Sequence, residues 1–203
     1  MNSIVDIFIF RHGETDWNKE RRFQGHTDIP LNQLGRDQAR RLTPLLAHYK
    51  PELILCSDLI RAKETAQIAN SILKAPVLES DALRECQLGD SEGLLLDKIL
   101  EIYGHESMRK WQSTSRDDDN FGFPNGETKK MHLERVKNYI ESFLFKNPHY
   151  RSVAISTHGG SLRRLVHHSE GAPTEPIPIP NCCLYKLQFD FKKNKWIFQG
   201  EVI

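Results

Sequence analysis

Three short apolar segments, each ending in polar residues, constrain the fold more than any other feature of the sequence. Residues 3–10 are mainly β-branched and aromatic, residues 53–56 read Leu-Ile-Leu-Cys, and residues 152–156 read Ser-Val-Ala-Ile-Ser. Runs of this length and composition are typical of strands buried in a parallel sheet. A helix-type pattern follows the second and third runs, so the sequence predicts strand–helix units and an open α/β sheet.

Ionisable side chains lie just past the carboxyl end of each predicted strand. Arg11 and His12 follow the first strand, Arg61 lies in the first helical turn after the second, and His158 follows the third. The carboxyl ends of parallel strands meet at one edge of an open α/β sheet, where the ligand crevice lies. We therefore expect these four side chains to converge. The position of Arg61 also suggests a functional role, because the helix dipole does not stabilise a cation in the first turn of a helix.

Apolar periodicity and helix start and stop residues predict the remaining elements. Ser57 or Asp58 is expected to cap the helix that carries Arg61. A short helical turn is expected at residues 16–18. The other expected elements are helices at about residues 32–49, 59–73, 94–103, 127–146 and 161–168, a short strand at 77–78, a mobile surface loop at 116–120, and a hairpin of residues 182–191 and 195–202.

Four ordered segments of the chain resemble the histidine phosphatase superfamily, also called phosphoglycerate mutase-like. The resemblance covers nearly the whole chain in the order of that family. It implies a three-layer α/β/α sandwich with a mostly parallel central sheet, as a single domain over residues 1–203 with a small cap-like insertion at about 91–126. The segments are Arg11-His12-Gly13-Glu14-Thr15 with Asn18 close behind, Ser57-Asp58-Leu59-Ile60-Arg61-Ala62, Leu83-Arg84-Glu85, and Ser156-Thr157-His158-Gly159-Gly160.

Phosphate chemistry explains why these residue types would occur together. A phosphomonoester is a dianion near neutral pH and repels an attacking group unless fixed positive charge surrounds its oxygens. Arg11 and Arg61 supply that charge through forked donors and stay protonated at any usable pH. A cationic His158 would add a third donor, and the backbone N–H of Gly159 at a helix start could add a fourth. No metal or other cofactor is then required.

His12 is the expected nucleophile. An imidazole whose other nitrogen donates to a backbone carbonyl presents an unprotonated nitrogen at neutral pH, and attack on phosphorus would give phosphohistidine. A neutral acid must protonate the departing alkoxide, and the resulting carboxylate can then activate water. The resemblance indicates Glu85 for this role, with Glu14 as its rival. It also implies substrate contacts from Asn18, Gln24 and Gly25 in the loop after the nucleophile.

Composition narrows the class of partner. Lys plus Arg total 28 and Asp plus Glu total 27, so the formal charge of +1 predicts no bulk attraction to nucleic acid or membrane. No basic region precedes the first apolar run, and Arg11 arrives too early for a spanning helix, so we expect a soluble cytoplasmic protein. The expected partners are a small phosphomonoester and the product, inorganic phosphate, for a monomer or homodimer.

Cysteines and histidines give no sign of a metal site. The cysteines lack Cys-x-x-Cys spacing and sit mostly in apolar runs, so we expect buried, reduced thiols. His167 and His168 are neighbours on a predicted helix and point about 100° apart, so they cannot ligate one ion together. We expect four histidines in polar surroundings to be solvated, namely His26, His48, His132 and His149.

Several functions remain open. The resemblance favours a histidine acid-type phosphatase acting on a small phosphorylated metabolite, such as a sugar phosphate or a ribazole phosphate. A cofactor-dependent phosphoglycerate mutase shares these residues, although mutases carry a longer insertion after the acid-bearing segment. A phosphoryl-binding module without turnover is weakened because every catalytic position is filled. Three arginines could reach a second anionic group of the substrate, namely Arg21, Arg84 and Arg109.

A serine esterase is the alternative from another class. The sequence Gly89-Asp90-Ser91-Glu92-Gly93 matches the Gly-x-Ser-x-Gly pattern of α/β-hydrolases, with Ser91 as the nucleophile. That motif requires a strand immediately before it. The preceding residues Glu85-Cys86-Gln87-Leu88 form a poor strand pattern, which argues against this function.

Overall fold

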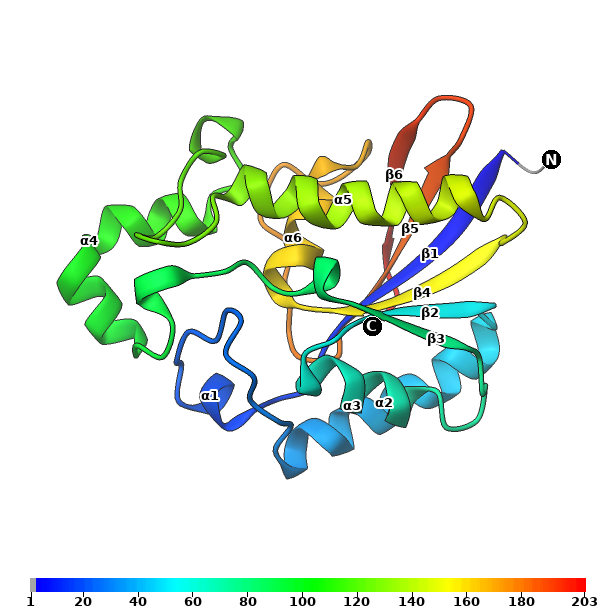
Figure 1. Ribbon diagram of the computed structural model, residues 1–203, viewed down its shortest axis with the longest axis horizontal. Coiled ribbons are helices and arrows are strands. Elements are labelled where there is room, and N and C mark those ends of the chain that lie inside the picture. The colour runs from blue at the N-terminus through cyan, green and yellow to red at the C-terminus, as the bar shows by residue number, and fades with distance from the viewer. Residues whose placement is uncertain (1–2) are drawn as a thin grey trace.

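The computed structural model describes residues 3–203 (Figure 1). These residues form a six-stranded sheet with the order β3-β2-β4-β1-β5-β6. The first four strands along the chain are parallel to one another, and the terminal hairpin of β5 and β6 pairs antiparallel with β1. The predicted mostly parallel sheet is therefore confirmed. The strands are β1 (Ile4–Arg11), β2 (Leu53–Ser57), β3 (Val77–Ser80), β4 (Ser152–Thr157), β5 (Leu184–Asp190) and β6 (Lys195–Glu201).

Helices cover both faces of this sheet (Figure 1). Strand β1 shows why, because successive side chains of a strand point to opposite faces. Its residues Val5, Ile7 and Ile9 pack in one apolar cluster with α5 and α6, whereas Phe8 and Phe10 pack in a second with α2 and α3. This confirms the three-layer sandwich. The four helices are α2 (Gln33–Tyr49), α3 (Ile60–Ala69), α5 (Lys129–Lys146) and α6 (Gly159–His168).

Helix α3 is shorter than predicted. The sequence pattern extends to residue 73, but the helix ends at Ala69. The side chain of Asn70 accepts a hydrogen bond from Ala75 N at 2.9 Å and donates one to Ala75 O at 2.8 Å. These two bonds close a turn that takes the chain out of the helix and into β3.

The predicted cap segment, residues 91–126, also departs from expectation. The helix expected to end at 103 continues as α4 (Leu96–Gln112), with a kink at Gly104, whose φ of 76° interrupts the helical backbone. The predicted loop at 116–120 contains the short 3-10 helix η3 (Arg116–Asp118). Figure 1 shows α4 at the end of the molecule away from the sheet hairpin. The segment packs together with the residues just before it around a small apolar cluster of Cys86, Leu88, Ile99, Met108 and Phe123.

Other expectations concern short elements and reactive groups. The predicted turn after the first strand is α1 (Asp16–Lys19). All four cysteines are free and buried, as predicted.

Within residues 3–203, no cluster of three or more His, Cys, Asp or Glu side chains is arranged to hold a metal ion. None of the helices in this part of the chain is long and apolar enough to cross a membrane. The remaining short elements are the 3-10 helices η1 (Asp81–Leu83) and η2 (Gly89–Ser91).

Candidate active site

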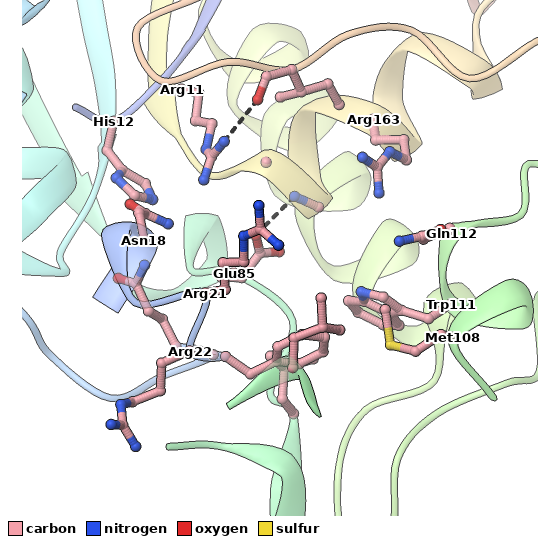
Figure 2. A pocket seen from close by; sticks show the side chains of 18 residues that line it. Arg11, His12, Asn18, Arg21, Arg22, Glu85, Met108, Trp111, Gln112 and Arg163 are labelled. Atoms are coloured by element: carbon pink, nitrogen blue, oxygen red, sulfur yellow. Dashed lines mark hydrogen bonds between the residues drawn. The ribbon is translucent and has the colours of Figure 1, made fainter. Parts of the chain in front are cut away.

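A cavity of about 300 Å³ lies beyond the carboxyl ends of β1 and β4 (Figure 2). Seven of the nine predicted site residues line it, and they come from five separate parts of the chain. Arg61 and His158 are not among the lining residues, and both side chains are completely buried. The seven lining residues are Arg11, His12, Asn18, Gln24, Gly25, Glu85 and Gly159.

Hydrogen bonds of its carbonyl group and of its ring fix His12 just past the end of β1. Its carbonyl accepts hydrogen bonds from Asn181 Nδ2 at 3.0 Å and from Cys182 N at 3.3 Å. The ring Nδ1 lies 2.7 Å from Gly13 O, a contact that requires Nδ1 to donate and leaves the lone pair on Nε2. Burial, together with the charges of two nearby guanidiniums, holds the pKa of His12 well below its ordinary value. The imidazole is therefore unprotonated at neutral pH.

Arg11 extends from the end of β1 over the start of α6. Its Nη1 donates to Ile179 O at 2.7 Å, as the dashed line in Figure 2 shows. Its Nε is shielded from solvent and has no partner within the described residues. A Cβ at position 159 would lie 3.4 Å from this nitrogen, at van der Waals contact, so the guanidinium packs directly against the start of α6.

Arg61 is fully buried behind the loop of residues 24–28. Its Nη1 donates to Thr27 O at 2.8 Å and its Nη2 to Gly25 O at 2.7 Å, whereas Nε has no partner among residues 3–203. Burial lowers the pKa of Arg61 to about 10, so the guanidinium remains charged at neutral pH. Arg61 therefore positions the carbonyls of the loop that forms the cavity wall.

Glu92 holds the same loop from the opposite side. Its Oε1 accepts from His26 N at 2.9 Å and from Leu88 N at 3.0 Å. Its Oε2 accepts from Thr27 N at 3.0 Å and from Thr27 Oγ1 at 2.9 Å. The sequence reasoning treated Glu92 only as part of a possible esterase motif. Its side chain instead ties the loop after the nucleophile to the start of the 91–126 segment.

His158 lies at the N-cap of α6 next to His12. Its ring centroid is 5.3 Å from that of His12, and its Nε2 lies 2.8 Å from Ser57 Oγ. Its Nδ1 is shielded and without a partner in the described part of the chain. Burial first, and then the charge of Arg61, hold the pKa of His158 well below its ordinary value. The imidazole is consequently neutral among these protein groups, so the predicted cationic form requires an added negative charge beside it.

Glu85 enters the centre of the cavity, as Figure 2 shows. Its Oε2 accepts from Gly160 N at 2.8 Å and its Oε1 from Cys86 N at 2.8 Å. A Cβ at position 160 would lie 2.2 Å from Oε1, so only glycine allows this approach. The rival Glu14 does not line the cavity, and its carboxylate accepts from Asn32 Nδ2 at 2.9 Å next to the N-cap of α2. Of the two carboxylates, only that of Glu85 borders the cavity.

His132 contradicts the expectation that it is solvated, because its side chain is 0% exposed. It lies on α5 four residues before Val136, so it shares the inward face of that helix. Its Nε2 is 2.9 Å from Ser161 Oγ and 3.8 Å from Glu85 Oε1. Burial holds the pKa of His132 well below its ordinary value. The spacing to Val136 and Ile140 was the signal that could have placed this histidine.

Replacement of His132 by glutamine should flatten the acid side of the stability profile. Below the ordinary histidine pKa of 6.5, the unfolded chain binds a proton at this position that the folded chain does not. The free energy of unfolding therefore falls as pH drops below that value, by about 1.4 kcal/mol per pH unit for each such histidine. Between about pH 7.5 and 5.5, denaturant unfolding of His132→Gln should show a loss of stability smaller by about 1.4 kcal/mol in total, which is an average slope smaller by about 0.7 kcal/mol per pH unit.

The exposed His149 provides the matched control, since His149→Gln should leave this slope unchanged. An equal slope in wild type and His132→Gln would contradict the interpretation.

Residues that sequence reasoning missed line the outer part of the cavity. Met108, Trp111 and Gln112 come from the part of α4 beyond the Gly104 kink, which the sequence pattern did not predict as helix. Arg163 lies one helical turn beyond Gly159 on α6, and this four-residue spacing could have identified it. Figure 2 shows these four side chains together on the side of the cavity opposite His12.

Only one of the three arginines considered for a second anionic group is available. Arg21 lines the cavity. Arg84 instead forms a bidentate pair with Asp58, with N···O distances of 2.7 and 2.5 Å, and does not line the cavity. Arg109 pairs with Glu106 on the outer face of α4. Sequence position alone could not show that both guanidiniums are already engaged.

Ser91 lacks the geometry of an esterase nucleophile. It lies in η2, with no strand immediately before it, and its side chain is buried. Its Oγ donates to Leu88 O at 2.8 Å, and the residue does not line the cavity. The strand–turn–helix arrangement that exposes such a serine is therefore missing at this position.

The fold and the cavity together define an α/β protein with a cation-lined pocket at the carboxyl edge of its sheet. A sequence profile of the histidine phosphatase superfamily (branch 1) matches residues 7–200, and the chain belongs to this family.

Relatives agree with that assignment. The chain is 33% identical over 192 residues to an uncharacterized phosphatase, PhoE, of Bacillus subtilis, covering 94% of this chain and 90% of the relative. It is 35% identical over 197 residues to phosphoglycerate mutase-like protein 4 of Arabidopsis thaliana, covering 96% and 84%. Among solved structures, a mycobacterial glucosyl-3-phosphoglycerate phosphatase with VO3 has a TM-score of 0.80 and 25% identity, covering 96% of this chain and 97% of that one.

Proposed function

We propose that the protein is a phosphatase that hydrolyses phosphomonoesters through a phosphohistidine on His12, without a metal. The observation that carries this proposal is that an unprotonated His12, the Arg11 guanidinium and the Glu85 carboxyl group border one cavity. An imidazole of this kind is a competent nucleophile, and the adjacent guanidinium offsets the charge of the phosphoryl group. Membership of a phosphatase family and the phosphatase relatives support it.

The reaction balances in two steps. In the first, Nε2 of His12 attacks phosphorus, the ester P–O bond breaks, and protonated Glu85 gives its proton to the leaving oxygen. In the second, the Glu85 carboxylate takes a proton from water as that water attacks phosphorus. The N–P bond then breaks and releases inorganic phosphate, with His12 and Glu85 back in their starting forms.

Three unpartnered nitrogens support phosphoryl binding next to His12. They are Arg11 Nε, Arg61 Nε and His158 Nδ1, all shielded from solvent and without partners within residues 3–203. A buried donor without an acceptor is costly, and phosphoryl oxygens are strong acceptors. A bound dianion would also favour the cationic form of His158. The N–H of Gly159 at the start of α6 provides a further donor.

The substrate in this proposal is a small phosphorylated metabolite of the sugar phosphate or ribazole phosphate type. Residues 91–126 act as a cap on a single domain of residues 1–203. Because Met108, Trp111 and Gln112 come from this cap and line the outer cavity, the cap contributes to substrate choice. Asn18, Gln24 and Gly25 complete the wall on the nucleophile side.

A panel of phosphomonoesters tests the proposed function. Inorganic phosphate should be released from a generic aryl phosphate and from at least one sugar or ribazole-type phosphate, without added bisphosphoglycerate. Addition of EDTA should leave the rate unchanged. Turnover that requires bisphosphoglycerate and yields an isomerised phosphoglycerate would identify a mutase, and binding without any phosphate release would identify a binding module.

A further inference from the structure

A second, smaller cavity of about 90 Å³ lies beside the candidate active site, between α4, α5 and α6. The two cavities share Trp111 and Arg163 as walls, but none of the predicted catalytic residues borders the second one. Its polar lining is strongly basic. Arg116, Lys129, Arg163 and Arg164 carry the positive charge and Asp119 is the carboxylate. The neutral polar lining residues are Ser113, Thr114, His167 and His168, since burial lowers the pKa of both histidines.

Several nitrogens of these basic side chains have no hydrogen-bond partner within the described residues. Lys129 is satisfied, because its Nζ donates to Lys110 O at 2.9 Å and to Ser113 O at 2.7 Å. The arginines are not, because Arg163 Nε and Arg164 Nε and Nη2 are shielded and have no partner in the described residues. Cationic donors kept from water without acceptors are costly. An anion in the cavity would place a strong acceptor beside the guanidiniums that line it.

Arg164 is also held in place. Its guanidinium lies over the ring of Trp111, with Cζ 4.5 Å from the ring centroid. Stacking of this kind restricts the guanidinium while leaving its edge free to donate hydrogen bonds. Its donors are therefore fixed before any ligand arrives, which lowers the entropic cost of binding.

We propose that this second cavity is an anion-binding site for a phosphoryl dianion, separate from the phosphoryl site beside His12. Its volume of about 90 Å³ is several times the roughly 10–15 Å³ that one water requires. Forked guanidinium donors match phosphate oxygens better than a point charge does. The phosphoryl group is either free inorganic phosphate or a second phosphoryl group on a substrate that reaches past Arg163.

Equilibrium dialysis with labelled inorganic phosphate tests the site directly. Wild-type protein should bind two ions per chain. Arg164→Met should weaken binding of one ion by about tenfold or more, whereas Arg11→Met should weaken the other. Arg41, exposed on α2, gives the matched control, and Arg41→Met should still bind two. One ion in wild type, or two ions of unchanged affinity in Arg164→Met, would overturn the proposal.

A measurement on unaltered protein covers the case in which Arg164→Met does not fold. Crystals soaked in selenate should show an anomalous peak within hydrogen-bond distance of the Arg164 guanidinium, in addition to one beside His12. A peak beside His12 alone would refute the second site while leaving the proposed phosphatase intact. A peak near Arg164 alone would support the second site and count against the phosphoryl site beside His12.

Steady-state kinetics separates the two sources of the anion. If the ligand is free phosphate, product inhibition should be mixed in wild type and competitive in Arg164→Met. If it is a second phosphoryl group, Arg164→Met should raise the KM for a sugar bisphosphate about tenfold more than that for the sugar monophosphate. Identical inhibition patterns and an equal change in both KM values would count against the site.

Discussion

Replacement of His12 by alanine is expected to lower kcat/KM for phosphomonoesters by about 10⁴-fold or more, a loss typical of removing a catalytic nucleophile. The ring Nδ1 donates to Gly13 O and the pKa is held low, so Nε2 is available to attack phosphorus. Loss of the imidazole removes the covalent route. Rapid quenching with labelled substrate should yield an acid-labile, base-stable phosphoenzyme in wild type and none in His12→Ala.

His149→Ala is the matched control because His149 is exposed and far from the cavity lining. It should retain both turnover and labelling. A phosphoenzyme that survives in His12→Ala would move the nucleophile to another residue and end the mechanism proposed above.

Replacement of Glu85 by glutamine is the second large effect, and its size should depend on the leaving group. For an alkyl phosphate, whose alkoxide must be protonated as it departs, turnover should fall by about 10²- to 10⁴-fold. For p-nitrophenyl phosphate, whose phenolate leaves without a proton, the fall in the first step should be much smaller. Burst kinetics with both substrates separates the formation of the phosphoenzyme from its hydrolysis.

Glutamine also disturbs the hydrogen bonds that Glu85 accepts from Gly160 N and Cys86 N, because only one of its terminal atoms can accept. Glu14→Gln is the control for a general loss of carboxylate charge near the nucleophile. Equal slowing of phosphoenzyme formation for good and poor leaving groups in Glu85→Gln would remove Glu85 from the acid role.

Local sequence predicted the parts of the molecule that depend on local chemistry. The strand before Arg11 is one example, because the composition and length of its apolar run indicate a buried strand. The position of His12 is another, because it follows the end of that run. Contacts between distant segments were not predictable in the same way. The start of α3 illustrates this, because Ser57 or Asp58 was expected to cap it, whereas Asp28 accepts from Ile60 N at 2.7 Å.

The candidate site was likewise predictable only where it depends on local sequence. Arg11 and His12 were predicted because they follow an apolar run, and Glu85 because its segment resembles that of the family. The far side of the site was not predicted, since Trp111 reaches the cavity only after the backbone turns at Gly104 and resumes a helix. Whether a guanidinium is free or paired depends on the tertiary structure. Arg84, a candidate from the sequence, is paired with Asp58, whereas Arg163, which the sequence did not single out, lines the cavity.

The position of β1 in the sheet has a consequence for how the protein folds. This strand is synthesised early, yet its two neighbours are β4 and β5, formed by residues 152–157 and 184–190. Contacts of such long sequence separation form slowly, because the chain entropy lost in closing large loops comes before the gain from pairing. The edge of the sheet that bears His12 therefore takes shape only after residues 184–190 have emerged from the ribosome. A nascent chain should acquire structure around α2 and α3 well before it can bind phosphate.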